Sequence, residues 1–349
     1  FSKKIFNNLS NNKKREIKFE IGERKTGGYF FLKDNMFSNF IKMRLKSLEN
    51  AYNGTIDQDA IFRPLNYVSA DYFHIFGMIN VVDTNNIYLY SNINGNNDVS
   101  LKLNLEHVGR YSLFSGQVVA IKGKNLGNDE FVVEKIHCIP SVEMNSCTIA
   151  DDCKLRIVFG EIDEIPLEGV HVLLLIMVNL NKHKNLLEDW VKADEKARKI
   201  IVIPVLGDDY SVNVYPQVMI NNFSRYFEFG TNPFQFSLNK KIISINTLDI
   251  LSQLKKEEVT FCPKKSDRYF NQNDDDLCGK VLFTGDRIDR LCHHILYQNS
   301  YLPVIMSDVN IQYDSQALIM GTCPDIYILK SKLEPFNKHI GKTEIINIG

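Results

Sequence analysis

The sequence lacks the paired cysteines by which many small structural sites are recognised. Its seven cysteines stand apart, and no two have the spacing C-x-x-C; they are at positions 138, 147, 153, 262, 278, 292 and 323. Structural zinc sites usually present such pairs, so their absence argues against a zinc finger or zinc ribbon. The odd count argues against a disulfide framework. We therefore expect a reducing compartment, either the cytosol or the nucleus.

The sequence also lacks an excess of charge and a long apolar run. Its 41 basic and 42 acidic residues give a formal net charge of −1. A protein whose main partner is duplex DNA usually carries a basic excess, so we expect DNA to be at most a weak partner. The longest apolar run, 170–180, contains His171 and Asn179. It is shorter than the about 18 residues that span a bilayer, so no membrane contact is predicted.

What is present is an ordinary globular composition, 44% hydrophobic and 24% charged, in a chain whose 349 residues predict two domains. The chain begins at Phe1 and not at a methionine, so we expect the natural N-terminus to lie further upstream. Changes in composition divide the chain into segments. They are a polar arm or linker at 1–29, a helix with its connector at 30–65, a first domain at 66–140, a linker at 141–154 and a second domain at 155–349.

The segment 30–50 has the pattern of one amphipathic helix. Apolar residues recur at spacings of three and four, with charged residues on the other side. Asn53-Gly54 predicts its C-terminal turn. Because an isolated helix of this length is marginal in water, we expect its stripe to pack on a neighbouring domain. The stripe consists of Met36, Phe37, Phe40, Ile41, Leu45 and Leu48.

Residues 66–140 contain short segments rich in β-branched and aromatic residues, separated by turn signals such as Asn94-Gly95. Five short strands in such a stretch indicate a small barrel, and an OB-fold fits that number. Ser115-Gly116-Gln117 predicts a tight turn before the fourth strand. The expected strands are 72–82, 87–90, 99–105, 117–122 and 130–136.

The aromatic residues of this barrel allow two interpretations. OB barrels often bind single-stranded nucleic acid by stacking bases on the aromatic rings of a basic face. In a small barrel, however, alternate aromatic residues usually fill the interior. Because few basic residues stand beside these aromatics in the sequence, we favour core filling or a protein contact. The residues concerned are Tyr72, Phe73, Phe76, Tyr88 and Tyr90.

The second domain alternates apolar strands with helices, which predicts an α/β architecture with more than one sheet layer. Two continuous apolar runs, 172–178 and 200–206, indicate buried parallel strands. One ring of the pair His293 and His294 is expected to be buried. The remaining elements are helices at 186–199, 248–254 and 286–298, strands at 155–160, 236–238, 241–245 and 326–329, and a surface loop at 263–280.

Polar residues follow the two buried strands at the points where they end. In a parallel sheet a ligand site lies just beyond the carboxyl ends of the strands. Whether these side chains can hold a metal therefore separates an enzyme from a scaffold. They are Asn179, Asn181, His183, Asp208, Asp209 and Tyr210.

The phrase at 111–119, which reads Y-S-L-F-S-G-Q-V-V, resembles one found in the B subunits of DNA polymerase α. The likeness continues in colinear order over about residues 29–349, although this chain has Met177, Asn181 and Tyr210 where the family usually has glycine, aspartate and histidine. The other similar segments are 29–50, 172–183, 202–217, 232–250, 290–303, 324–333 and 347–349.

The resemblance implies a mixed α+β chain: an N-terminal helix, an OB-fold barrel, then an α/β calcineurin-like phosphoesterase sandwich that has lost its catalysis. It implies a non-catalytic accessory subunit in the nucleus. Its partners would be the C-terminal zinc-binding domain of the catalytic polymerase subunit and, in the same assembly, the primase subunits. The family's separate N-terminal domain would lie upstream of Phe1.

The residues agree with a loss of catalysis. A phosphoesterase of this class needs carboxylates and histidines in the motifs D-x-H, G-D-x-x-D, G-N-H-D/E and G-H-x-H, together with a lone histidine, to hold two metals. None stands at the end of its strand, and only His183, Asp208, Asp209 and Asp163 remain as possible ligands. We therefore predict no catalytic residue, no metal and no cofactor. Three alternatives stay open: an active metal-dependent phosphodiesterase, a single-stranded DNA-binding OB module, and a small subunit of polymerase δ or ε.

Overall fold

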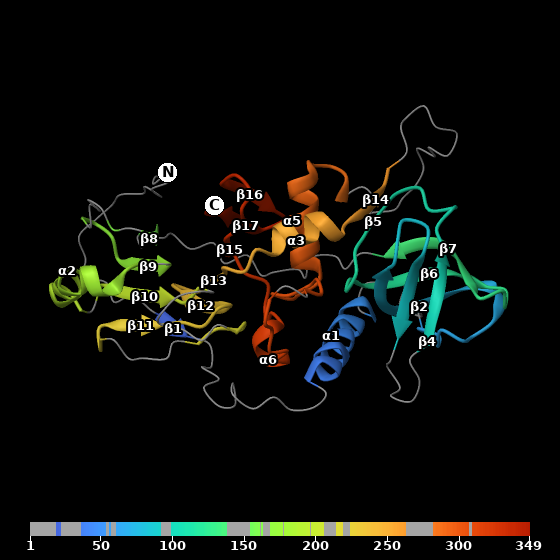
Figure 1. The fold of residues 1–349 in the computed structure, drawn as a ribbon, viewed down its shortest axis with the longest axis horizontal. Coiled ribbons are helices and arrows are strands. Elements are labelled where there is room, and N and C mark those ends of the chain that lie inside the picture. The colour runs from blue at the N-terminus through green and yellow to red at the C-terminus, as the bar shows by residue number, and fades with distance from the viewer. Residues whose placement is uncertain are drawn as a thin grey trace.

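The computed structural model contains a closed five-stranded barrel, a four-stranded sheet and a six-stranded sheet. The barrel lies at one end of the molecule and the four-stranded sheet at the other, with helices and the six-stranded sheet between them (Figure 1). No helix among the described residues is long and apolar enough to cross a membrane. The structure describes residues 19–21, 36–53, 56, 61–91, 99–137, 154–160, 162, 168–176, 178–195, 197–205, 214–218, 224–262, 282–306 and 309–349.

Helix α1 (Met36–Asn53) lies between the barrel and the rest of the molecule (Figure 1). Its first half places Phe40 in the core beneath the six-stranded sheet. Its second half places Leu48 and Tyr52 against the outside of the barrel. The expectation that the apolar stripe packs on a neighbouring domain is confirmed, and the helix ends at Asn53 as predicted.

The barrel has the strand order β2-β3-β4-β7-β6, and the five predicted strands are all present. Phe73 packs against Phe131 of the barrel core, which confirms core filling at that position. Tyr72 does not fill the core, because its side chain is 52% exposed, and a protein contact at that position stays a prediction. Phe76 is buried, but against α1 and not inside the barrel. The strands are β2 (Ser69–Val81), β3 (Ile87–Ser91), β4 (Val99–Asn104), β6 (Val118–Asn125) and β7 (Glu130–His137).

The predicted turn at Ser115-Gly116-Gln117 is confirmed. Gly116 has a φ of +94°, a conformation that residues with a side chain rarely adopt. A Cβ atom at Gly116 would lie 3.0 Å from the carbonyl oxygen of Pro303. The turn therefore needs glycine both for its backbone and for its close approach to the second half of the chain.

The four-stranded sheet is parallel throughout and has the order β11-β10-β9-β8. Every residue of β9 is buried, as expected for a central parallel strand covered on both faces. The helix expected at 186–199 is α2, Leu180–Lys192, and Lys199 belongs to β10, so the prediction was wrong at both ends. The strands are β8 (Leu155–Phe159), β9 (Val172–Ile176), β10 (Lys199–Ile203) and β11 (Phe227–Phe229).

The six-stranded sheet is mixed and has the order β1-β12-β13-β15-β17-β16. Part of the segment expected to be a polar arm forms its edge strand, because 19–21 pairs antiparallel with β12. Strands β13, β15 and β17 run parallel to one another. The strands are β1 (Phe19–Ile21), β12 (Phe234–Leu238), β13 (Lys241–Asn246), β15 (Ile326–Leu329), β16 (Phe336–Ile340) and β17 (Thr343–Asn347).

The two sheets stack on each other, and helices cover their outer faces. Leu174 and Ile201 of the four-stranded sheet share one core with Phe236 and Ile328 of the six-stranded sheet. Helix α2 packs on the other face of the smaller sheet. Helices α3 (Ile250–Glu257), α5 (Arg287–Tyr297) and α6 (Ser315–Leu318) pack with the larger sheet. The expected multilayer α/β arrangement is therefore present, and we call these two sheets with their helices the sandwich.

A short strand from each half of the molecule joins the barrel to the sandwich. Strand β5 (Tyr111–Leu113), which follows β4, pairs antiparallel with β14 (Val259–Phe261), which follows α3. The pairing places Ser112 opposite Thr260. Phe114, the residue after β5, is fully buried in the core of the sandwich. Residues 111–114 thus reach from the barrel into the sandwich before the chain returns to the barrel at β6.

Candidate functional site

Asn179 begins helix α2. Its side chain accepts a hydrogen bond from the backbone N–H of Lys182 at 3.2 Å, which satisfies one of the free donors at the helix start. Asn179 itself is exposed. Its position after β9 is therefore explained by helix capping.

The other residues predicted to line the strand ends divide into two groups. Asn181 and His183 lie in the first turn of α2. Asp208, Asp209 and Tyr210 lie outside the described residues, as does Asp163. In the part of the chain that the structure describes, no three His, Cys, Asp or Glu side chains lie close enough together to hold a metal ion. The set as a whole stays a prediction.

A buried network of neutral groups lies beyond the carboxyl end of β13. The Asn232 side-chain amide donates to Oε1 of Gln217 and to Oγ1 of Thr247, the latter at 2.6 Å. The backbone N–H of Thr247 donates back to Oδ1 of Asn232 at 3.0 Å. We call these three residues the Asn232 network. It ties three separate segments together without an ionisable group.

Asn246, the last residue of β13, organises a second set of neutral contacts. Its Oδ1 accepts from the Tyr215 hydroxyl at 3.1 Å, and its Nδ2 donates to the carbonyl oxygen of Tyr301 at 2.8 Å. Burial raises the pKa of Tyr215 well above its ordinary value, so the phenol keeps its proton and acts as a donor. These groups hold the backbone in place and offer no nucleophile.

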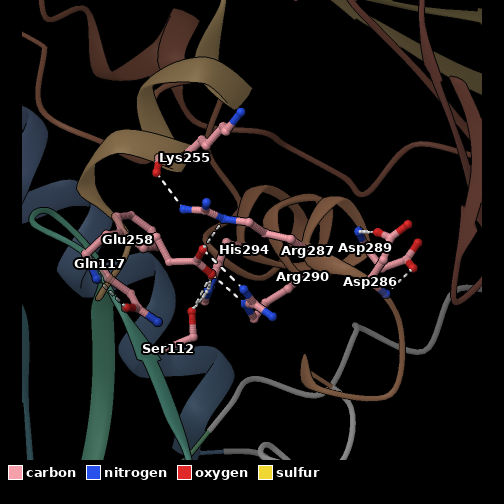
Figure 2. Close-up of polar contacts among 10 residues, drawn as sticks. Ser112, Gln117, Lys255, Glu258, Asp286, Arg287, Asp289, Arg290 and His294 are labelled. Atoms are coloured by element: carbon pink, nitrogen blue, oxygen red, sulfur yellow. Dashed lines mark hydrogen bonds and ion pairs between the residues drawn. The ribbon is translucent and has the colours of Figure 1, made fainter. Parts of the chain in front are cut away.

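A group of charged side chains lies where the barrel meets the sandwich (Figure 2). The carboxylate of Glu258, with a side chain 1% exposed, accepts from Arg290 Nε at 2.5 Å and from Arg287 Nε at 3.0 Å. It also accepts from the hydroxyl of Ser112, on β5, at 2.8 Å. His294 Nε2 lies 2.7 Å from that same hydroxyl. We call these five residues the Glu258 cluster.

The protonation states in this cluster follow from burial and hydrogen bonding. Burial alone would raise the pKa of Glu258, but hydrogen bonds from Arg290 and Ser112 outweigh it and the pKa lies below its ordinary value. Burial lowers the pKa of His294 to about 4, against the opposing attraction of Glu258. His294 is therefore neutral at pH 7. The single hydrogen of the Ser112 hydroxyl is used in the hydrogen bond that it donates to Glu258. The contact between Ser112 and His294 is therefore one in which Nε2–H of His294 donates and the hydroxyl oxygen accepts.

A second contact between barrel and sandwich centres on Gln298, the C-cap residue of α5. Its side chain makes two hydrogen bonds to the backbone of Val118 on β6, accepting at 2.7 Å and donating at 3.0 Å. Its Oε1 also accepts from Arg44 of α1 at 3.1 Å. Gln298 thus connects the three parts of the molecule that meet at this junction.

Arg44 is a buried cation in this junction, with only 2% of its surface exposed. Burial lowers its pKa to about 10, which still leaves it charged at pH 7. Its guanidinium carbon lies 5.6 Å from the ring centroid of Phe40. No carboxylate among the described residues forms an ion pair with it, and its Nε has no hydrogen-bond partner there. Within the described residues, Arg44 is therefore held by the hydrogen bond to Gln298 and by packing, and not by a carboxylate.

The junction is built for attachment and not for chemistry. Glu258 is ionised and His294 is neutral at pH 7, and both side chains are enclosed and hydrogen-bonded. A substrate could not reach them without separating the barrel from the sandwich. What the arrangement does is fix two halves of the chain to each other.

Sequence reasoning anticipated part of this junction. It expected one buried ring in the pair His293 and His294, and His294 is the buried one. It missed Glu258 and Arg44, because Arg44 looks in sequence like a solvated residue of its helix and Glu258 lies beyond the end of the helix predicted at 248–254. The signal in the sequence was that Arg44 stands next to the apolar stripe of its helix. Ile41, three residues earlier, and Leu45, one residue later, both belong to the stripe and pack in the core.

Two family models match the chain. The model for the B subunit of DNA polymerase alpha/epsilon matches residues 177–338. The model for the OB domain of the DNA polymerase alpha B subunit matches residues 62–139, the range that holds the barrel. The two matched ranges together cover more than half of the chain.

The chain is also similar to curated proteins named as the B subunit of DNA polymerase alpha. The protein from Schizosaccharomyces pombe is 22% identical over 77% of this chain and 54% of its own length. The Bos taurus protein is 22% identical over 75% of this chain and 48% of its own length. The Mus musculus protein is 23% identical, with 71% and 46% covered. The chain thus spans about half the length of these relatives.

Proposed function

The chain belongs to the family of DNA polymerase alpha B subunits, and from this we propose that it is a non-catalytic scaffold for the catalytic polymerase subunit. It would bind that subunit's C-terminal zinc-binding domain and so position it relative to primase. The work would take place in the nucleus, at the initiation of DNA replication.

The observation that carries the proposal is the junction between barrel and sandwich. The Glu258 cluster and the Gln298 contact fix the two halves with buried polar groups, and α1 packs on both. A rigid pair of domains offers a partner two surfaces at a fixed distance. Such preorganisation reduces the ordering cost of binding.

We further propose that the sandwich is a calcineurin-like phosphoesterase fold without catalysis. Two stacked sheets with helices outside support the fold. The loss of catalysis is supported by the capping role of Asn179 and by the neutral side chains of the Asn232 network. Neither set supplies the negative charge that a two-metal site requires.

A co-purification experiment tests the scaffold. The chain is co-expressed in turn with the C-terminal domain of the catalytic subunit of polymerase α, δ or ε, and recovered through a tag on the chain. We expect stoichiometric recovery of the α domain alone. Recovery of the δ or ε domain in preference would assign the chain to another polymerase.

An activity assay tests the loss of catalysis. The purified chain is incubated with Mn²⁺ and bis(p-nitrophenyl) phosphate, beside an active phosphodiesterase as the positive control. We expect no turnover above the Mn²⁺ blank. Turnover that is abolished by changing both Asp208 and Asp209 to Asn would show a working metal site and refute this part of the proposal.

A further inference from the structure

One outer face of the barrel is apolar at one end and carries tyrosine and lysine at the other. Alternate residues of a strand point to opposite sides, so Phe76 and Tyr72 of β2 lie on the same side of the sheet, as do Ala120 and Lys124 of β6. Near Phe76, Val118 and Ala120 this outer side is apolar, and α1 covers it. Further along, the same side carries tyrosine and lysine.

The uncovered part brings together cations from a neighbouring strand and an exposed ring. The ammonium groups of Lys122 and Lys124 lie 5.6 Å and 5.5 Å from the ring centroid of Tyr72. Lys122 is opposite Lys135 of β7 in the strand register. Few basic residues stand beside Tyr72 in the sequence, because the cations that lie near its ring in the fold are about 50 residues away along the chain.

A second exposed ring near the start of β2 does not belong to this surface. Tyr67 is 41% exposed, but it packs edge-on against Phe73, whose side chain points into the barrel on the opposite side of the strand from Tyr72. We call Tyr72, Lys122, Lys124 and Lys135 the Tyr72 face. Among the described residues, one carboxylate pairs with it: Glu134 bonds Lys122 at 2.9 Å. The face thus combines an exposed ring with a net positive charge in a chain that is nearly neutral overall.

We propose that the Tyr72 face binds single-stranded nucleic acid. Phosphate groups would pair with the ammonium groups of the lysines, and this would free the Tyr72 ring to stack on a base. An acidic protein segment would match the charges, but it would not need an exposed ring flanked by two cations at about the same distance. This binding goes beyond the scaffold function and does not depend on it.

The test is a fluorescence anisotropy titration of a labelled oligothymidine with the whole chain, at several salt concentrations. We expect Tyr72→Ala to weaken binding by about tenfold, the loss of one stacked base. We expect Lys124→Gln to reduce the slope of log affinity against log salt by about 0.7, the loss of one phosphate contact. Both side chains lie at the surface, so both variants should melt at the temperature of the unaltered chain.

Tyr88→Ala is the matched control, because Tyr88 lies on β3 of the same barrel and away from this face. It should bind as the unaltered chain does. Polyglutamate serves as an anionic competitor without bases and should displace the oligonucleotide poorly.

Three results would overturn the proposal. One is no binding by the unaltered chain at about 50 mM salt. Another is binding that Tyr72→Ala and Lys124→Gln leave unchanged, or that Tyr88→Ala abolishes. The third is displacement by polyglutamate as effective as by unlabelled oligothymidine, which would identify the occupant as an acidic protein segment. None of these results bears on co-purification with the polymerase domain.

Discussion

The Asn232 network is buried, and so is the centre of the Glu258 cluster, although its Arg287 is half exposed. Both join segments far apart in sequence, but they are built from different chemistry. The first uses amides and a hydroxyl inside the sandwich. The second uses a carboxylate, two guanidinium groups, an imidazole and a hydroxyl between barrel and sandwich. Neutral contacts keep their strength at any ordinary pH, whereas ionised ones depend on protonation. Mild acid should therefore weaken the contacts between the sandwich and the barrel, but not the neutral contacts of the Asn232 network inside the sandwich.

The largest expected effect is that of Glu258→Ala. It leaves Arg290, with a side chain only 12% exposed, without its carboxylate, and loss of one partner of a buried pair costs about 3 kcal/mol. Calorimetry should show a lower melting temperature than that of the unaltered chain. Glu257→Ala, at the neighbouring position on α3, is the control and should cost less than about 0.5 kcal/mol. Equal effects of the two variants would contradict the role of the cluster.

Asn232→Ala should cost about 2 kcal/mol, because Gln217 and Thr247 lose their buried partner. Since no ionised group takes part, the cost should be the same at pH 7 and pH 5. Urea unfolding followed by the fluorescence of Trp190, the single tryptophan, measures it within the sandwich. Gln316→Ala, an exposed position, is the control. A cost that changes with pH would show that the comparison with the Glu258 cluster is mistaken.

Acid should weaken the attachment of the barrel through His294. Its pKa is about 4 in the folded protein, against 6.5 for the free side chain, so the unfolded chain takes up the proton first as the pH falls. Stability present above pH 6.5 is lost towards pH 4, by about 1 kcal/mol between pH 6.5 and 5.5. His293, also with a lowered pKa, acts in the same direction. The lowered pKa of Glu258 adds a loss only below its ordinary value of 4.5.

His294→Gln is the variant that isolates this effect. The amide keeps a donor for Ser112 but cannot take up a proton in this range. Calorimetric melting temperatures measured from about pH 7.5 to 5.0 should fall less steeply for the variant than for the unaltered chain. Parallel profiles would mean that another group causes the pH dependence.

The smallest effect is expected for Arg44→Met. The change loses the hydrogen bond to Gln298 but also removes a buried charge without a carboxylate partner among the described residues. Replacing buried ionic groups by apolar ones of similar volume is often neutral or stabilising, so the net change should stay below about 1 kcal/mol. Arg44→Ala leaves a cavity as well and should cost more. Calorimetric melting temperatures of the two variants, compared with each other and with the unaltered chain, distinguish the effect of lost packing from the effect of the lost charge.

The sequence predicted local elements better than the contacts between them. The five barrel strands and the capped helix α5 carry their own patterns of alternation, period and N-cap, so they were found nearly at their observed ends. Helix α2 was misplaced because Asn179 was interpreted as a site residue and not as a cap. The pairing of β5 with β14 joins segments more than 140 residues apart, and no local sequence pattern predicts it.

The candidate sites show the same division. His294 could be expected to be buried from its helical face, but its partners Ser112 and Glu258 come from other elements. The basic neighbours of Tyr72 became visible only through the register of β2 with β6. The charge and cysteine content limited the classes of function, and the position of each contact depended on the fold.

The contact between Arg44 and Gln298 has a consequence for synthesis of the chain on the ribosome. The two residues are 254 positions apart, so α1 emerges long before its partner exists. At about 5–20 residues per second the interval is roughly 10 to 50 s. The barrel is complete well before then and can hold Leu48 and Tyr52 of the helix. The first half of α1, with Phe40 and Arg44, stays exposed until its partners in the sandwich have been synthesised. During that interval it is accessible to a chaperone.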